Sequence, residues 1–228
     1  MAQVFSKGIL TQEQRKVIDI LAKLKGIKDF YWGGATALAD IYYAHRRSYD
    51  LDFFTTKIGL TEYFALEVQS ALKGYRLLER SPVHSVLEGA IRIDLAYNPV
   101  LLRPNDVYEN GVKVASYEDL IANKVMAFME RVTYKDTVDF YFIVQKEGIW
   151  VPIRLALRKE EWQIDLPRLI EAIEIAKEFP DEIEKWGLDI IVPLKVSHLK
   201  EILEKIAHEL QTTLTKTKDD FQSSKQKL

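Results

Sequence analysis

The chain of 228 residues contains no cysteine and only four histidines. The absence of cysteine excludes a disulfide framework, a cysteine nucleophile and cysteine-ligated zinc. The histidines are His45, His84, His198 and His208. Because none of them follows another at the H-x-x-x-H spacing, a zinc site built on histidine is not expected either.

Long apolar runs and a large excess of charge are also missing. No apolar run approaches the roughly 20 residues that span a bilayer, and the opening MAQVFSKGILTQEQRK lacks the apolar core and cleavage pattern of a secretion signal. We therefore expect a cytoplasmic protein that has no membrane partner. The net charge of -2 argues against a wholly basic nucleic-acid binder. A local basic patch remains compatible with it, since binding depends on the distribution of charge.

What the sequence does have is the composition of a globular protein with a real core. It is 47% hydrophobic and 29% charged, and its length fits one large domain or two small ones. Strand-like and helix-like patterns are mixed up to about residue 115, and almost everything after that is helical. We predict an α/β (α+β) fold, with a small mixed-sheet core over residues 1–115 and a mainly helical domain over residues 116–228.

Periodicity and turn residues give the expected elements. Thr11 and Gln14 form a capping-box pattern that starts a helix ending near Gly26, and Thr61 is expected to cap a helix that ends at Gly74. Another helix is expected over 35–44. Strands are expected around 29–34 and over 49–55, 75–80, 84–89, 90–97 and 112–115. Helices are then expected over 116–131, 135–146, 166–178, 181–186 and 198–214.

Two aspartates stand out in the strand predicted over 49–55. Asp50 and Asp52 are two residues apart, so their side chains point to one face with Cα atoms about 6.5–7 Å apart. Two like charges at that distance are costly without a cation, and Mg²⁺ (or Mn²⁺) prefers such oxygen ligands. If the strand containing Asp94 lies alongside, three carboxylates gather into a metal site. A solvated strand edge with a surface Asp94 explains the same pattern.

Residues just before this strand carry phosphate-binding chemistry. Gly33 and Gly34 fall at a strand-to-helix junction, where the backbone can approach a phosphate closely and the helix N–H groups attract anions. Arg47 and Ser48 immediately precede the acidic pair, where they can meet phosphates or a polynucleotide backbone. A solvated loop is the alternative for these two residues.

A second block, LIANKVMAFMERVTYKDTVDFYFI, places charges on predicted helices. Lys124 and Arg131 occupy neighbouring places on one helix and can neutralise a triphosphate. Asp136 and Asp139 share a face of the next helix at the i, i+3 spacing. Surface ion pairs on an ordinary helical hairpin would look the same.

The stretch GGATALADIYYAHRRSYDLDFF resembles the nucleotidyltransferase superfamily signature, in which paired glycines, a helix and Asp-x-Asp on a strand follow one another. Its H-R-x-S-x-D-L-D-F-F form is similar to the AbiEii-type nucleotidyltransferase toxins of abortive-infection and type IV toxin–antitoxin systems, and the second block supports this. The resemblance implies that Lys124 binds nucleotide phosphate and that Asp136 orients or deprotonates the acceptor. It also implies an RNA acceptor such as a tRNA end, and an antitoxin partner.

The expected reaction is metal-dependent transfer of NMP from an NTP to an acceptor hydroxyl, in a cleft between the two halves. Asp50, Asp52 and Asp94 would bind the metal, whereas Gly33, Gly34, Arg47, Ser48, Arg131 and Asp139 would bind substrate. Two alternatives stay open. The acceptor could be a small hydroxylated molecule such as an aminoglycoside, or the protein could bind NTP without turnover.

Overall fold

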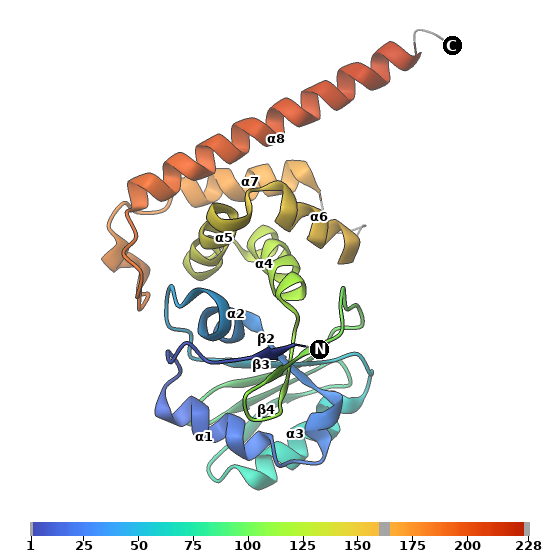
Figure 1. Cartoon of the computed structure of the whole chain (residues 1–228), viewed down its shortest axis with the longest axis vertical. Coiled ribbons are helices and arrows are strands. Elements are labelled where there is room, and N and C mark those ends of the chain that lie inside the picture. The colour runs from blue at the N-terminus through green and yellow to red at the C-terminus, as the bar shows by residue number, and fades with distance from the viewer. Residues whose placement is uncertain (1, 160–164, 226–228) are drawn as a thin grey trace. The chain divides into compact units, whose positions relative to one another are not determined.

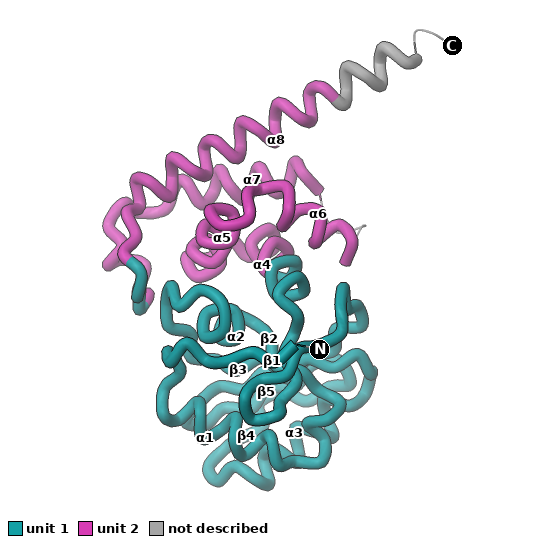
Figure 2. Tube along the Cα trace, viewed as in Figure 1, with its two compact units in different colours: residues 1–123, 189–192 teal, residues 124–188, 193–228 magenta. Residues whose placement is uncertain are grey.

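The computed structural model describes residues 2–159 and 165–225, and side chains up to residue 216 (Figure 1). Its contacts divide the chain into two compact units (Figure 2). Unit 1 comprises residues 1–123 and 189–192, and unit 2 comprises residues 124–188 and 193–228. The late segment 189–192 therefore belongs to the N-terminal unit. The domain boundary predicted after residue 115 stays a prediction.

Unit 1 contains a mixed sheet of eight strands in the order β1-β7-β8-β2-β3-β6-β5-β4, among the residues described. The strands are β1 (Gln3–Val4), β2 (Tyr31–Gly33), β3 (Leu51–Thr55), β4 (Arg76–Arg80), β5 (His84–Glu88), β6 (Ile93–Tyr97), β7 (Asp106–Tyr108) and β8 (Lys113–Val114). Neighbouring strands pair in parallel at β1–β7, β8–β2 and β3–β6, and antiparallel elsewhere. This sheet and the helices below confirm the predicted α/β class.

Helices cover both faces of this sheet (Figure 1). They are α1 (Gln12–Leu21), the 3-10 turn η1 (Gly26–Asp29), α2 (Gly34–Leu38), the π-helical η2 (Ala39–Tyr43) and α3 (Leu60–Ala71). Helix α2 lies on one face against β2 and β3, whereas α1 and α3 lie on the other, where α3 packs on β4, β5 and β6. The acids of β3 and β6 thus lie on the α2 face.

Strict alternation in the two central strands explains this placement. Leu51 and Phe53 of β3 are fully buried, as are Ile93 and Leu95 of β6, while the residues between them are partly exposed. Each buried side chain of this kind contributes about 1.5–3 kcal/mol relative to exposure. A slip of one residue would place the carboxylates in the core, so burial fixes which residues face α2.

Two helix starts differ in how well the sequence predicted them. The capping box of Thr11 and Gln14 is present at α1, which confirms that prediction. The prediction that Thr61 caps α3 is wrong, because the N-cap is Gly59 with φ of 86°. The chain turns at this glycine, so the helix begins at Leu60. The Thr61 hydroxyl instead donates to the Ser81 carbonyl at 2.7 Å.

The helix predicted over 35–44 is broken after five residues. It starts at Gly34, widens to a π-helix over Ala39–Tyr43 and ends at Ala44, whose φ is 51°. Inside the π-helical turn, the fully buried Asp40 accepts hydrogen bonds from the Ser6 hydroxyl, the Ile9 N–H and the Tyr108 hydroxyl. A buried carboxylate needs such donors, so Asp40 ties this turn to the N-terminal segment and to β7.

Unit 2 is helical, as predicted. The helices in this part of the chain are α4 (Tyr117–Arg131, starting in unit 1), α5 (Tyr134–Glu147), α6 (Trp150–Lys159), α7 (Leu166–Lys177), the 3-10 turn η3 (Ile183–Trp186) and α8 (Val196–Lys225). Phe128 of α4 stacks on Phe140 of α5 with ring centroids 4.4 Å apart. Helix α6 was not expected from the sequence. Its Pro152 lies in the first turn, where proline is tolerated.

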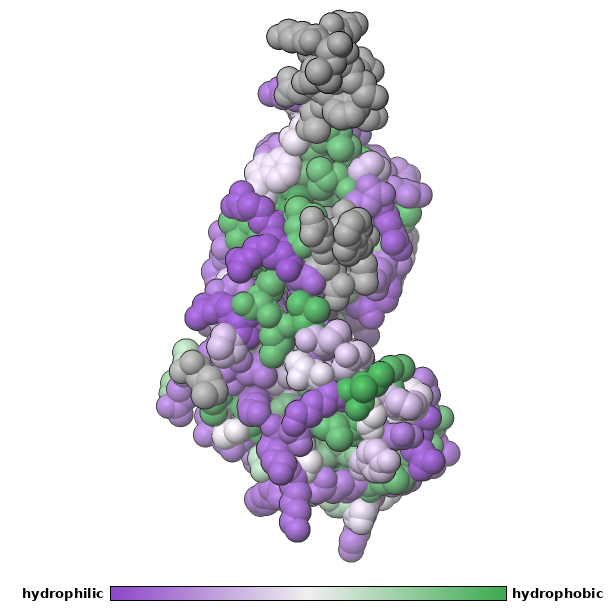
Figure 3. Space-filling model, turned by 90° about the vertical axis from the view of Figure 1, so that its right-hand side faces the viewer, coloured by the Kyte–Doolittle hydropathy of each residue, from purple (hydrophilic) through white to green (hydrophobic). Residues whose placement is uncertain are grey.

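The surface is mixed in character. In the view of Figure 3, hydrophilic side chains surround smaller hydrophobic areas. Over residues 2–159 and 165–225, no helix combines the length and the apolar character needed to cross a bilayer.

Candidate active site

Two of the three predicted aspartates lie in the two central parallel strands, and the third lies just before one of them. Asp52 of β3 stands directly opposite Asp94 of β6, so both carboxylates leave the sheet on the same face. Asp50 precedes β3 by one residue and interacts electrostatically with Arg92, while the Leu51 N–H donates to the Arg92 carbonyl at 2.9 Å. The predicted adjacency of the two strands is confirmed.

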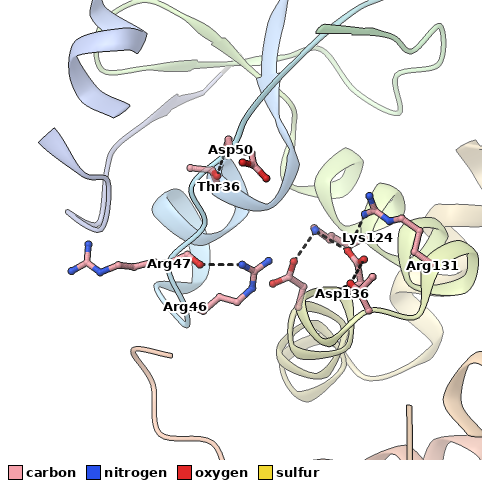
Figure 4. Close-up of polar contacts among 9 residues, drawn as sticks. Thr36, Arg46, Arg47, Asp50, Lys124, Arg131 and Asp136 are labelled. Atoms are coloured by element: carbon pink, nitrogen blue, oxygen red, sulfur yellow. Dashed lines mark hydrogen bonds and ion pairs between the residues drawn. The ribbon is translucent and has the colours of Figure 1, made fainter. Parts of the chain in front are cut away.

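The paired glycines are needed where α2 begins above this acidic pair. Gly34 has φ of +69°, and a Cβ on it would lie 1.9 Å from Asp52 Oδ2. A Cβ on Gly33 would lie 2.8 Å from the ring of Phe54. The Thr36 hydroxyl donates to the Asp50 carbonyl at 2.5 Å (Figure 4). The start of α2 therefore rests on the Asp50–Asp52 segment, and the absence of a side chain at Gly34 makes room for the Asp52 carboxylate.

Asp94 already has cationic and imidazole partners. Arg92 Nε lies 2.7 Å from Asp94 Oδ2, and Arg92 Nη2 lies 3.1 Å from Oδ1. His84 Nε2 lies 3.3 Å from the same Oδ1, while His84 Nδ1 lies 3.1 Å from Glu79 Oε1. The hydrogen bond to Asp94 raises the pKa of Arg92 above its ordinary value.

The donor set matches a hard divalent cation in ligand type, because carboxylate oxygens on one face are what Mg²⁺ binds. Within the described part of the chain, however, no group of three acidic or histidine side chains is arranged closely enough to hold a metal ion. To bind a metal ion, the Asp94 carboxylate would have to give up its contacts with Arg92 and His84.

The loop before β3 is held by hydrogen bonds. Arg46 is 1% exposed and donates from Nη1 to the Arg47 carbonyl at 3.0 Å (Figure 4). Arg47 donates from Nη1 to the Ile9 carbonyl at 2.9 Å, and its Nε lies 3.3 Å from Asp189 Oδ2. The Ser48 carbonyl accepts from Gln14 Nε2 at 2.8 Å. Arg47, predicted to bind substrate, thus has protein partners, and its side chain remains 40% exposed.

A segment from far along the chain completes this loop. The Arg47 N–H donates to the Asp189 carbonyl at 2.8 Å, and the Ile191 N–H donates to the His45 carbonyl at 2.9 Å. The Tyr49 hydroxyl donates to Asp189 Oδ2 at 2.9 Å, which raises the pKa of Tyr49. We call residues 189–192 the strap. It fixes the loop that leads into Asp50.

The second predicted cluster is formed inside unit 2. Lys124 Nζ lies 2.7 Å from Asp139 Oδ2 and 3.4 Å from Asp136 Oδ1, and Arg131 Nη2 lies 3.0 Å from the same Asp136 oxygen (Figure 4). The Thr133 hydroxyl donates to Asp136 Oδ2 at 2.7 Å and, as the N-cap of α5, accepts the Asp136 N–H. Four residues predicted from one sequence block therefore meet.

Burial separates the two cations of this cluster. The Lys124 side chain is 8% exposed and its partners Asp136 and Asp139 are 4% and 0% exposed. The Arg131 side chain is 59% exposed. The formal charges of these two cations and two anions sum to zero. A phosphate can therefore reach the Arg131 guanidinium directly, whereas Lys124 is enclosed by carboxylates that orient it.

Sequence comparison places this chain in a known family. A family model described as the nucleotidyl transferase AbiEii toxin of type IV toxin–antitoxin systems matches residues 74–217, more than half of the chain. The chain belongs to the AbiEii family. It is therefore a nucleotidyltransferase of a toxin–antitoxin family. The matched region contains Asp94 and the whole Lys124 cluster, whereas the paired glycines and Asp50-x-Asp52 precede it.

Individual proteins similar to this AbiEii family member share less than 30% of their residues with it. An uncharacterized protein of Aquifex aeolicus is 28% identical over 180 residues, covering 76% of this chain and 86% of its own length. The structure of MenT4, a nucleotidyltransferase toxin from Mycobacterium tuberculosis, has a TM-score of 0.61 at 17% identity, covering 87% of this chain and 82% of that one. JHP933 from Helicobacter pylori has a TM-score of 0.55 at 19% identity, covering 97% and 99%. These structures share the fold.

Several residues around the AbiEii site were not singled out from the sequence. Arg92 and His84 contact Asp94, and Thr36 binds the Asp50 segment. Only Arg92 had a visible signal, because the alternation in AIRIDLAY already places it on the face of Asp94. Nothing local marks the strap, whose partners lie about 140 residues earlier in the chain.

Proposed function

We propose that this protein transfers NMP from an NTP to an acceptor hydroxyl in a metal-dependent reaction, with RNA, such as a tRNA end, as the acceptor. The observation that carries the proposal is the register of β3 and β6, which sets Asp52 opposite Asp94 beneath the glycine pair. Family membership supplies the reaction class. Beyond the reaction class, we propose the metal dependence, the RNA acceptor and the role of each residue.

The acidic residues of unit 1 have the metal-binding role. Asp50 and Asp52 hold Mg²⁺ or Mn²⁺, and Asp94 completes the ligand set. The ion supplies charge neutralisation for the triphosphate and polarises the reacting oxygens when bound. The start of α2 keeps the Asp52 carboxylate in place, since Gly34 fits against it. Preorganised ligands of this kind avoid reorganisation during the reaction.

Phosphate and acceptor contacts come from the basic residues. Arg131 offers a half-exposed guanidinium to phosphate, and Lys124 adds positive charge that Asp136 and Asp139 orient. Arg47 and Ser48 lie in the loop that leads into Asp50, where they meet the NTP or the acceptor backbone. Asp136 acts by positioning these cations, because both contact the same carboxylate oxygen.

The proposed partners follow from membership of the AbiEii family. The matching model is described as a toxin of a type IV toxin–antitoxin system. We infer that the protein consumes NTP as a toxin and that an antitoxin counteracts it in the cell.

The test is label transfer from each α-labelled NTP to total RNA in the presence of Mg²⁺. Asp52→Asn should abolish transfer, since it keeps the size of the side chain and removes its charge. Asp181→Asn, at a side chain that is 80% exposed in unit 2, is the matched control and should retain transfer. Labelled RNA is then identified by mass spectrometry of its ends.

Other outcomes have defined meanings. Label on an added aminoglycoside but never on RNA would replace the acceptor proposed here. NTP binding without any product would indicate a binding module. If wild-type protein neither binds NTP nor transfers label from any of the four nucleotides, the enzymatic proposal is wrong.

A further inference from the structure

The ion pair between Arg92 and Asp94 uses the carboxylate that we propose as a metal ligand. Arg92 lies one residue before β6 and reaches forward to Asp94, so that Nε and Nη2 meet the two carboxylate oxygens separately. His84 approaches one of these oxygens from β5. Both oxygens of Asp94 therefore have donors in this structure, and this fork-like contact is the strong form of an arginine–carboxylate pair.

The guanidinium also acts on the neighbouring acid. Arg92 interacts electrostatically with Asp50 as well as with Asp94. Asp52 and Asp94 bring two formal negative charges to this face of the sheet, and Asp50 adds a third just before β3. Arg92 offsets one of these charges. Neighbouring carboxylates repel one another unless a cation lies near, and Arg92 supplies such a cation.

The arginine and the aspartate side chains at this site differ in their freedom to move. Asp52 and Asp94 leave paired central strands, and Asp52 also packs against Gly34. The Arg92 side chain is long, precedes its strand and is 42% exposed, compared with 18% for Asp94. A rotation of the Arg92 side chain toward solvent leaves the Asp94 carboxylate in place on its paired strand.

We propose that Arg92 is a built-in counter-ion that competes with a divalent ion for Asp94 and must leave before Asp94 can bind that ion. This inference rests on the proposed metal dependence. It makes Arg92 a positioning residue that lowers the affinity for free metal. The released guanidinium carries the positive charge that an incoming phosphate requires, so metal entry prepares the site for NTP.

The experiment titrates the protein with Mn²⁺ in the absence of nucleotide. Electron paramagnetic resonance of the free ion measures how much Mn²⁺ is bound. Arg92→Gln should bind Mn²⁺ about two- to fivefold more tightly than wild type, the range that corresponds to a partly exposed ion pair. Arg92→Lys keeps the charge but loses the forked contact and should fall between the two. Arg80→Gln, an exposed arginine on β4, is the matched control and should equal wild type.

The outcomes separate this inference from the proposed function. If wild type binds Mn²⁺ and Arg92→Gln binds it equally or more weakly, the counter-ion role is wrong while the metal-dependent reaction stands. If neither protein binds Mn²⁺ with or without NTP, both proposals fall. A crystal structure with Mn²⁺ gives a second readout. It should show Arg92 Nε beyond hydrogen-bond distance of Asp94, and an unchanged pair beside a bound ion would overturn the inference.

Discussion

Gly34→Ala tests whether the close approach of α2 to the acidic pair matters for both stability and catalysis. The new Cβ would lie 1.9 Å from Oδ2, 2.6 Å from Cγ and 2.8 Å from Cβ of Asp52. Real Cβ atoms do not tolerate such distances, so the Asp52 side chain or the start of α2 has to shift. The substitution also places a side chain on a residue with φ of +69°.

The expected loss of stability has two parts. A non-glycine residue in the left-handed region costs about 1–2 kcal/mol. Forcing extra atoms into a filled space costs about 1–3 kcal/mol more. We therefore expect Gly34→Ala to lower the free energy of unfolding by about 2–5 kcal/mol. Label transfer should fall much further than stability does, because the residue that moves is a proposed metal ligand.

Gly187→Ala is the matched control. Gly187 has φ of +62°, and apart from Gly187 and its two chain neighbours no heavy atom of the described residues lies within 4 Å of the position that its Cβ would take. This variant therefore carries the backbone penalty alone. Urea denaturation should show a loss of about 1–2 kcal/mol, with transfer retained. The difference between the two glycine variants then measures the contact with Asp52.

A double variant identifies the partner in the clash. Gly34→Ala combined with Asp52→Ala removes the contacts to Oδ2 and Cγ while the one to Cβ remains. The two substitutions should therefore be less destabilising together than the sum of both, by about 0.5–3 kcal/mol, and the double variant should stay inactive. The reasoning is refuted if Gly34→Ala is no less stable than Gly187→Ala and transfers label at the wild-type rate.

Three further predictions concern other parts of the molecule. Lys124→Met should lower the free energy of unfolding in urea by about 3–5 kcal/mol, because it leaves the fully buried Asp139 without this ion pair; a loss below about 1 kcal/mol would contradict it. Asp40→Ala should cost at least about 2 kcal/mol in thermal unfolding, since three donors lose their acceptor, and unchanged melting would contradict it. Burial raises the pKa of Tyr42 to about 12 from an ordinary value of 10. The unfolded chain then loses this proton first, so stability should fall as pH rises from 10 to about 12. Tyr42→Phe should remove that part of the decline, and ultraviolet titration of phenolate should show one late-ionising tyrosine fewer in the variant than in the wild type.

The sequence predicted the central strands well because their alternation leaves little choice. In AIRIDLAY the apolar residues must face the core, which places Asp94 on the opposite side. The same logic placed Asp52, and register then brought it opposite Asp94. Asp50, predicted inside the strand, lies one residue before it. The Lys124 cluster was also visible, since i, i+3 and i, i+7 spacings on neighbouring helices are local.

What the sequence could not show was set by tertiary contacts. Strands β1 and β7 are two and three residues long and carry too little pattern to be recognised. The break in the helix after Leu38 accompanies the buried Asp40, whose donors come from distant segments. Thr61 had the residue type of a cap, yet the positive φ of Gly59 decided where the helix begins.

The strap has a consequence for how the protein is made. The loop of residues 45–49 is hydrogen-bonded to Asp189 and Ile191, which leave the ribosome long after the sheet of unit 1 has been synthesised. A nascent chain can therefore assemble all eight strands while the segment leading into Asp50 still lacks its final support. Because translation must pass residue 192 before that support exists, the segment that carries Asp50 reaches its finished setting only after the strap has been made.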